Sequence, residues 1–379
     1  MDAYRITGPA RLSGEVTISG AKNSVLKIMA ASLMVRGPVT LKRVPQITDV
    51  HLMADVLERL GAQVTRSGST ITIDASGDLS EDTPYELVTK MRASIQVLAP
   101  LLARLGRARV ALPGGDAIGS RPIDMHLSAL ERMGVKLVSQ HGYVEGRADR
   151  LRGTHVLLEF PSVGATENLL MAGVTAEGRT SIENAAREPE IQDLANFLNR
   201  CGARITGAGT PSVEIEGVPE LEPGSYEIIP DRIEAGTYAI AAAATGGDIT
   251  LSDVISNHLE LPLQKLEEAG AEVRRGDGEV RVAMSSRARS MDLVTLPFPG
   301  FPTDLQPLMM VLLAQADGAS IVTENVFESR FLFVDELNRM GSQIRVEGHH
   351  AVIRGVHKLS GAPVRAPDIR AGAALVVGG

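Results

Sequence analysis

The sequence predicts an α/β fold assembled from repeats of about 70 residues, each running β-α-β-α-β-β. One observation behind this prediction is an amphipathic helical segment that ends in glycine and leads into alternating polar and apolar residues. A second is an almost wholly apolar helical segment that recurs between these copies. The third is composition: 44% of the 379 residues are hydrophobic but only 3% are aromatic, so small and aliphatic side chains must fill the core.

One helix of each repeat has a single apolar face. Leu52, Val56 and Leu60 follow the helical period, and a glycine directly after such a segment is typical of a helix C-terminal cap. Residues 63–73 then alternate on either side of a turn, which predicts two strands. The five capping glycines are Gly61, Gly134, Gly202, Gly270 and Gly341.

The other helix of each repeat is apolar on all sides behind a short polar head, as expected of a buried helix. The sixth copy reaches Gly379, so the chain holds five repeats and part of a sixth. We expect two sets of three repeats, with buried helices inside and sheets outside. Residues 21–230 would form a first domain, carrying a mobile loop at 112–122. Residues 1–20 and 231–379 would form a second domain, truncated at its C-terminal end.

Composition excludes several function classes. The net charge of −8 and the scarcity of aromatic residues disfavour nucleic-acid binding. No apolar run reaches the ~18 residues of a membrane span, and the N-terminus has no signal-peptide pattern. The single cysteine, Cys201, favours a reducing cytoplasm and is interpreted as a core thiol. The pair His349-His350 has no accompanying metal-ligand spacing, so no metal site is expected.

The polar heads of the buried helices are the first candidates for a binding site. Helix N-termini attract anions, and Lys22, Arg92 and Arg370 add positive charge that suits phosphate or carboxylate. The same residues would also serve as ordinary helix caps and surface charges, and this alternative stays open. The heads are Lys22-Asn23, Arg92, Thr166-Glu167-Asn168, Asp231-Arg232, Asp304 and Asp368–Arg370.

Two further segments contain residues suited to catalysis. The glycine-rich loop 112–122 could close over a ligand, with Arg121 as an anion clamp and Asp116 as an acid. An exposed turn would have the same composition, and the loop does not have the P-loop pattern. The proline-rich segment 296–307 places Asp304 at a helix start, either as a cap or as a general base.

Seven segments together resemble the enolpyruvyl transferases, and the resemblance extends over essentially all 379 residues. The segments are SGAKNS (Ser19–Ser24), MRAS (Met91–Ser94), PGGDAIGSRPIDMH (Pro113–His126), SVGATEN (Ser162–Asn168), REPEIQDL (Arg187–Leu194), FPGFPTDLQP (Phe298–Pro307) and DIRAG (Asp368–Gly372). The resemblance implies a two-domain inside-out α/β barrel of six repeats, and a monomer.

The resemblance also implies an activity: transfer of enolpyruvyl from phosphoenolpyruvate to the 3′-hydroxyl of UDP-N-acetylglucosamine, with release of phosphate. The reaction would proceed by addition and elimination through a tetrahedral ketal, as a cytoplasmic step of peptidoglycan precursor synthesis, with neither metal nor organic cofactor. The catalytic residues carried over are Lys22, Asp116, Arg121, Asp304, Asp368 and Arg370. The substrate-binding residues carried over are Asn23, Arg92, Pro122, Ile123, Asp124, Met125, Ser162, Val163, Gly164, Asp231 and Phe327.

Two features depart from the family pattern. Asp116 stands where most members have cysteine, so the antibiotic fosfomycin would find no thiol to alkylate. A final arginine that contacts phosphate in the family would lie beyond Gly379. Two alternatives remain at this level: enolpyruvyl transfer to shikimate 3-phosphate, and a catalytically impaired or inactive paralogue that binds a nucleotide sugar.

Overall fold

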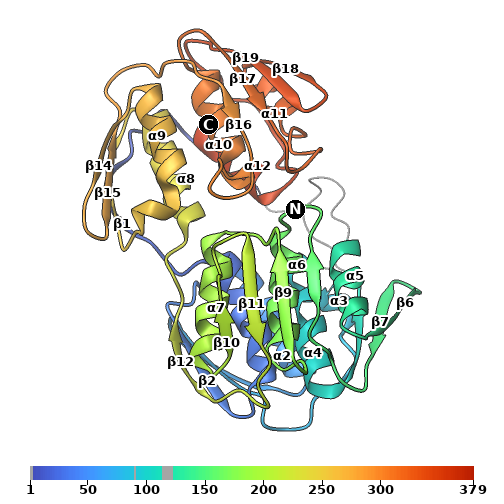
Figure 1. Cartoon of the computed structure of the whole chain (residues 1–379). Coiled ribbons are helices and arrows are strands. Elements are labelled where there is room, and N and C mark those ends of the chain that lie inside the picture. Colours follow the sequence, from blue (N-terminus) through green and yellow to red (C-terminus); the bar gives the residue numbers. More distant parts are fainter. Residues whose placement is uncertain (1–2, 89–90, 113–122) are drawn as a thin grey trace. The chain divides into compact units, whose positions relative to one another are not determined.

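The computed structural model describes residues 3–88, 91–112 and 123–379, with the Arg92 side chain excepted (Figure 1). These residues form two compact units. The first unit consists of the described residues between 20 and 229. The second unit consists of residues 3–19 and 230–379.

The predicted α/β repeat is confirmed in both units. A four-stranded sheet of this protein has one parallel edge strand followed by three antiparallel strands. The edge strand comes from the start of a repeat, the next strand follows its buried helix, and the last two form the hairpin after its amphipathic helix. The barrel arrangement of the repeats stays an expectation.

The first unit contains three sheets. Their orders are β12-β2-β4-β3, β8-β9-β11-β10 and β5-β7-β6, and in the last an isolated parallel bridge between Asp82 and Arg109 stands in the place of the edge strand. The strands are β2 (Pro38–Lys42), β3 (Gln63–Ser67), β4 (Thr70–Asp74), β5 (Arg107–Ala111), β6 (Lys136–Gln140), β7 (Tyr143–Arg147), β8 (His155–Leu157), β9 (Arg179–Glu183), β10 (Arg204–Thr206), β11 (Ser212–Glu216) and β12 (Gly224–Glu227).

The second unit contains two sheets, ordered β1-β13-β15-β14 and β16-β17-β19-β18. The first of them joins the N-terminal strand to strands more than two hundred residues later, because β1 pairs in parallel with β13. The strands are β1 (Ser13–Thr17), β13 (Asp248–Ser252), β14 (Glu272–Arg275), β15 (Glu279–Ala283), β16 (Leu293–Val294), β17 (Ala319–Thr323), β18 (Gln343–Glu347) and β19 (His350–Arg354).

The helices divide into the two predicted kinds. The apolar helices of the first unit are α1 (Lys22–Ala31), α4 (Leu98–Leu105) and α6 (Val163–Gly173), and those of the second are α8 (Arg232–Ala244), α10 (Gln306–Ala314) and α12 (Ile369–Gly378). The amphipathic helices are α2 (Thr48–Arg59), α5 (Asp124–Arg132), α7 (Pro189–Arg200), α9 (Glu260–Ala269) and α11 (Val334–Arg339); α3 (Tyr85–Val88) is one short turn. Every residue of α10 is buried.

The repeated glycines do cap the amphipathic helices. Their φ angles lie between 90° and 105°, a region that residues with a side chain rarely adopt. At Gly61 the space is closed as well, because an added Cβ would lie 2.5 Å from the carbonyl oxygen of Asp78. Each unit has its own apolar core around its buried helices.

Two buried helices begin differently from the prediction of one continuous helix. Short 3₁₀ segments, η2 (Arg92–Val97) and η4 (Thr303–Leu305), precede α4 and α10. Pro100 and Pro307 lie in the first turns of these α-helices and have no N–H for an i→i−4 bond. The chain before each proline therefore tightens into i→i+3 turns. In the second unit this places Asp304 in the 3₁₀ turn rather than in the α-helix.

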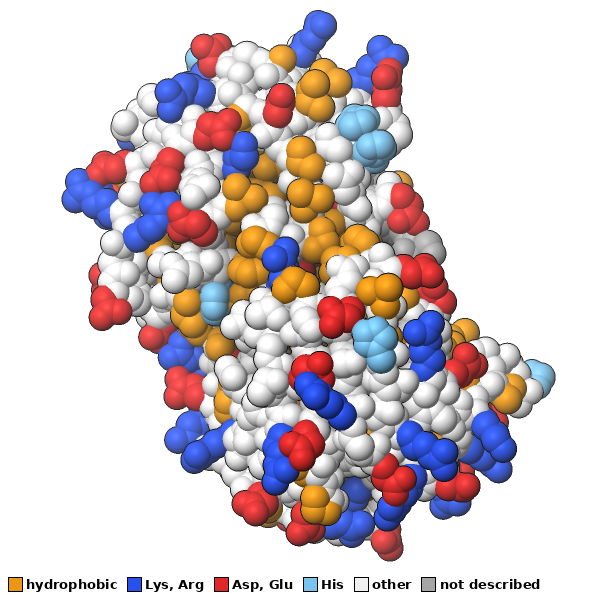
Figure 2. Space-filling view, viewed as in Figure 1, with side chains coloured by type: hydrophobic (Ala, Val, Ile, Leu, Met, Phe, Trp, Pro, Cys, Tyr) orange, Lys and Arg blue, Asp and Glu red, His pale blue; other side chains and the backbone are white. Residues whose placement is uncertain are grey.

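The surface is mixed in charge. Figure 2 shows Lys and Arg interspersed with Asp and Glu over the visible face, and many of these groups form exposed ion pairs such as Arg204 with Glu216 at 3.0 Å. Such pairs contribute about 0–1 kcal/mol each. Within the described residues, no helix combines the length and apolar character that a membrane crossing requires.

Candidate functional site

In the second unit, three of the predicted site residues lie around one buried arginine. Arg370 donates from Nη2 to Oδ2 of Asp304 at 3.1 Å. Arg330 donates from its own Nη2 to Oδ1 of Asp304 at 2.5 Å, and its Nη1 lies 3.8 Å from Oδ1 of Asp368. The cluster thus alternates two carboxylates with two guanidinium groups.

Local structure fixes the members of this cluster. Asp368 is the N-cap of α12, where its Oδ1 accepts from the backbone N–H of Arg370 at 2.8 Å and of Ala371 at 3.0 Å. Asp304 is held in the 3₁₀ turn before α10, and α10 packs against α12. The caps of these two helices therefore bring both acidic side chains to Arg330.

Arg330 is the most deeply buried charged group of the cluster, with 1% of its side chain exposed. Its Nε donates to Oγ1 of Thr303 at 3.2 Å. Burial by itself would raise the pKa of Asp304, but the guanidinium groups of Arg370, Arg330 and Arg232 hold that pKa well below its usual range. Asp304 is therefore an ionised carboxylate at neutral pH.

The loop after β17 places Phe327 beside the same arginine. The guanidinium carbon of Arg330 lies 5.6 Å from the centre of the Phe327 ring, within the range of a cation–π contact. Glu324 holds the loop: its Oε1 accepts from the backbone N–H of Phe327 at 3.0 Å, and its Oε2 accepts from the Thr303 hydroxyl at 3.0 Å.

The predicted residue Asp231 is the N-cap of α8. Its Oδ1 accepts from the backbone N–H of Ile233 at 2.8 Å and of Glu234 at 3.0 Å. The next residue, Arg232, lies with its guanidinium carbon 5.6 Å from the centre of the Phe298 ring. Asp231 is thus a helix cap. Its neighbour Arg232 is close enough to Asp304 for its positive charge to lower the pKa of that carboxyl group.

In the first unit, Lys22 and Asn23 form the first turn of α1. The Lys22 ammonium lies 2.8 Å from Oδ2 of Asp49, at the start of α2. The Asn23 carbonyl accepts a hydrogen bond from Nζ of Lys27 at 2.7 Å. An anion that bound Lys22 would compete with Asp49 for the same ammonium group.

The predicted residues Ser162, Val163 and Gly164 begin α6. Ser162 is its N-cap, and its Oγ accepts from the N–H of Ala165 at 3.3 Å. Gly164 lies against His126, since an added Cβ would come within 2.8 Å of that imidazole ring. A larger residue at this position would have to displace the ring, and the close approach joins the start of α6 to α5.

Helix α5 carries the predicted residues 123–125 at its start: Ile123 is the N-cap position, and Asp124 and Met125 follow in the first turn. A buried amide links this region to α6, because Nδ2 of Asn168 lies 2.8 Å from Oε1 of Gln96 and 2.8 Å from Nδ1 of His126. The first unit therefore gathers predicted residues from α1, α5 and α6 at helix N-termini.

Four predicted residues are not placed. Asp116, Arg121 and Pro122 lie outside the described residues, as does the side chain of Arg92, whose backbone begins η2.

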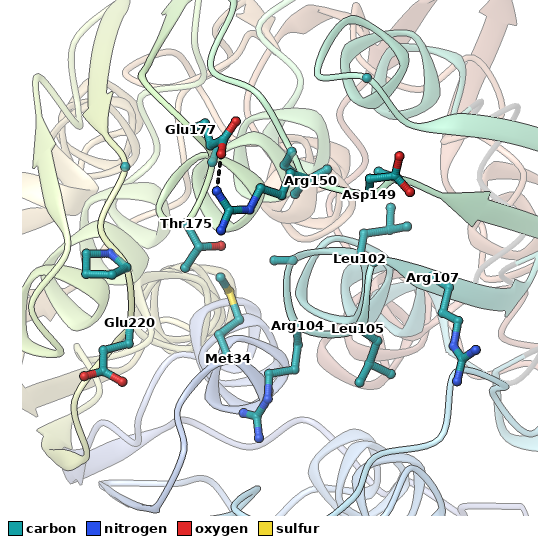
Figure 3. Close-up of a pocket in the computed structure, with 18 of the residues that line it drawn as sticks. Met34, Leu102, Arg104, Leu105, Arg107, Asp149, Arg150, Thr175, Glu177 and Glu220 are labelled. Atoms are coloured by element: carbon teal, nitrogen blue, oxygen red, sulfur yellow. Dashed lines mark hydrogen bonds and ion pairs between the residues drawn. The ribbon is translucent and has the colours of Figure 1, made fainter.

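A cavity of about 1170 Å³ in the first unit lies away from all the predicted site residues (Figure 3). It opens at the C-terminal ends of the buried helices, past Met34, Leu105 and Thr175. Figure 3 shows Arg150 paired with Glu177 across one side. Arg104, which lines the cavity, donates to the carbonyl oxygen of Leu33 in the turn after α1 at 3.1 Å and to that of Ala75 after β4 at 2.8 Å.

Sequence reasoning missed Arg330 and Gln96. Arg330 stands in the run FESRFLFV, where a single cation among apolar residues could have indicated a buried arginine with a carboxylate partner. Gln96 carried no such signal. Glu167 was noted only as part of a polar head, yet 1% of it is exposed.

Comparison with known families gives one match over nearly the whole chain. The family model of EPSP synthase (3-phosphoshikimate 1-carboxyvinyltransferase) matches residues 6–379.

Individual proteins give a consistent result. The chain is 55% identical over 376 residues to the UDP-N-acetylglucosamine 1-carboxyvinyltransferase of Corynebacterium efficiens, covering 99% of this chain and 89% of that protein. It is 53% identical over 378 residues to the protein of the same name from Mycobacterium bovis, covering 100% and 90%. The solved enolpyruvyl transferase NikO of Streptomyces tendae superposes with a TM-score of 0.88 at 27% identity, covering 98% of this chain and 89% of that one.

Proposed function

Because the chain belongs to the EPSP synthase family of enolpyruvyl transferases, we propose that it transfers enolpyruvyl from phosphoenolpyruvate to the 3′-hydroxyl of UDP-N-acetylglucosamine. The choice of acceptor rests on full-length relatives that carry this activity in their names. The structural observation that carries the chemistry is Asp304, an ionised carboxylate held between the guanidinium groups of Arg330 and Arg370. The monomeric state and cytoplasmic location stay predictions.

The reaction needs a base, an acid and anion-binding groups. The 3′-oxygen forms a bond to C2 of phosphoenolpyruvate while its proton passes to the base and C3 gains a proton. The resulting ketal then loses a proton from C3 as the C2–O bond to phosphate breaks. We assign proton acceptance to Asp304, and anion binding to Lys22 and Arg370, both of which pair with a carboxylate in the described structure.

The low pKa of Asp304 makes it a weak base as it stands. A phosphate or carboxylate that drew Arg370 away would remove the strongest of the attractive charges that lower the pKa of Asp304. Binding of the anionic substrate would therefore increase the basicity of Asp304 where the hydroxyl proton must be taken. Asp304 would therefore take the proton of the sugar hydroxyl only when the anionic substrate is also bound.

The acceptor is tested by ligand stabilisation. A ligand that binds the folded state raises Tm, by an amount equivalent to ~2.7 kcal/mol at a hundredfold excess over Kd. We expect UDP-N-acetylglucosamine to raise Tm and shikimate 3-phosphate to leave it unchanged. Phosphate release with the same two acceptors provides the second measurement. The opposite preference would assign the chain to the other acceptor, and binding without phosphate release would identify an inactive paralogue.

Fosfomycin is expected not to inactivate this protein covalently. Asp116 occupies the position of the usual loop cysteine, and a carboxylic acid forms no thioether. The only thiol of the chain, Cys201, is buried, and burial raises its pKa to about 11, so it is a poor nucleophile. Intact-mass analysis after incubation checks this, with Asp116→Cys as the matched positive control. An adduct on the unmodified protein would contradict the prediction.

A further inference from the structure

We propose that Glu167 is a positioning residue for the start of α1: acting through Lys27, it holds the turn that carries Lys22 and Asn23. The proposal rests on the proposed function only for the roles of Lys22 and Asn23. Glu167 itself touches neither of them, so its effect is indirect.

The contacts run from α6 to α1 through one ammonium group. Oε2 of Glu167 accepts from Nε2 of Gln96 at 2.8 Å, which fixes the carboxylate in the interior. Oε1 has no hydrogen bond among the described residues, and Nζ of Lys27 lies 3.6 Å away. The same Nζ donates to the carbonyl oxygen of Asn23 at 2.7 Å. Lys27 thus connects a buried carboxylate to the backbone of the first turn of α1.

The start of α1 depends on such side-chain contacts because it has no cap of its own. Its N-cap position is Ala21, which supplies no side-chain acceptor. Three contacts with neighbouring helices hold the turn: Lys22 with Asp49 of α2, Ser24 with Asp193 of α7, and the Lys27 link to Glu167 of α6. The third involves the carbonyl of Asn23 itself.

The charged groups around Glu167 make this link sensitive to pH. Burial raises its pKa, Lys27 from α1 opposes that rise, and Glu190 and Glu188 from the start of α7 add repulsion, which leaves the pKa at about 7. Gln96 from η2 contacts Glu167 directly, and His126 from α5 is linked to Glu167 only through the side-chain amides of Asn168 and Gln96. Below pH 7 Glu167 is neutral, and Lys27 loses the counter-ion that keeps it over Asn23.

The first experiment follows the turn directly by NMR of the full ¹⁵N-labelled chain. The Ser24 N–H belongs to the same peptide group as the carbonyl that accepts the Lys27 bond, and the Asn23 N–H precedes it. We expect both amide signals to titrate with a midpoint near pH 7. Glu167→Gln should abolish this titration, and the exposed control Glu177→Gln should retain it. An unchanged midpoint in Glu167→Gln, or no titration in the wild-type chain, would overturn the proposal.

The second experiment is a double-mutant cycle on kcat/KM. Glu167→Gln and Lys27→Met should each reduce kcat/KM by roughly 10- to 100-fold, as small displacements of catalytic groups do. The double variant should lose no more than the worse single variant, because both changes break one link. Losses that multiply would contradict the proposal. If the wild-type chain releases no phosphate from the proposed substrates, the proposed function fails, and the amide titration still decides the positioning role.

Thermal unfolding separates positioning from loss of structure. The folded-state pKa of Glu167 lies above the usual value of an unfolded glutamate, so its ionisation opposes folding increasingly as pH rises between those two values. Glu167→Gln should therefore raise Tm relative to wild type at pH 8 and give no gain at pH 4. A variant that gains stability at pH 8 while kcat/KM falls cannot owe that fall to unfolding.

Discussion

Replacing Asp304 with asparagine is expected to reduce kcat by roughly 10²- to 10⁴-fold, the range lost with a general base. Asparagine keeps the shape and can still accept from Arg330, so the substrates should bind with Kd values within a few fold of wild type. Steady-state kinetics measure the expected fall in kcat, and calorimetry measures the expected Kd values. A kcat near the wild-type value would remove Asp304 from the mechanism.

The lowered pKa of Asp304 also predicts how the Tm of the same variant should compare with wild type as pH changes. The folded-state pKa of Asp304 is lowered, so its ionised form stabilises the fold at every pH above the unfolded value and loses that effect only in strong acid. The Tm difference between wild type and Asp304→Asn should thus be constant from pH 5 to 9. The control is Asp317→Asn, a side chain that is 83% exposed, which should leave both kcat and Tm unchanged. A difference that shrank within that range would show that Asp304 titrates there.

Much of the fold could be predicted because the residues that determine its helices and turns are close together in the chain. The glycines after the amphipathic helices stand where φ must be positive, and Gly61 shows that packing against Asp78 allows nothing larger. The apolar run that becomes α10 is buried at every residue. Both patterns depend only on residues that are close together in the chain, so the sequence alone is enough to predict them.

The parts that could not be predicted depend on residues far apart in the chain. The 3₁₀ turn that presents Asp304 depends on Pro307, which is visible in the sequence, but its pairing with Arg330 joins residues separated by 26 positions. Gln96 and Glu167 are separated by 71 positions. The first pair forms when the two helical segments of one repeat fold together, and the second forms when two repeats pack against one another. The repeat period does not specify which polar side chains meet in either case. Candidate residues were therefore predictable one by one, and their partners were not.

Arg330 shows how much a missed partner can matter: Arg330→Met is expected to destabilise the protein by about 3–5 kcal/mol, the cost of removing one member of a buried ion pair. Methionine fills similar space, but it leaves Thr303 without its donor and two carboxylates, Asp304 and Asp368, without the guanidinium between them. Chemical unfolding measures this loss. Arg345→Met, at a side chain that is 82% exposed, is the matched control and should change the free energy of unfolding by less than about 0.5 kcal/mol.

Arg330→Lys tests the catalytic role of Arg330 with a smaller expected loss of stability, because a lysine keeps the positive charge. A single ammonium cannot reproduce the guanidinium fork that reaches both Thr303 and Asp304, so kcat/KM should fall by about 10²-fold. The pKa of Asp304 should rise as one of its two bonded arginines is lost. An acid limb from protonation of Asp304 should then move up into the measurable pH–rate profile, separate from the Glu167 titration near pH 7, because a protonated Asp304 cannot accept the hydroxyl proton. A profile identical to that of wild type would mean that Arg330 supports the fold alone, and that Arg370 and Arg232 suffice to keep Asp304 ionised.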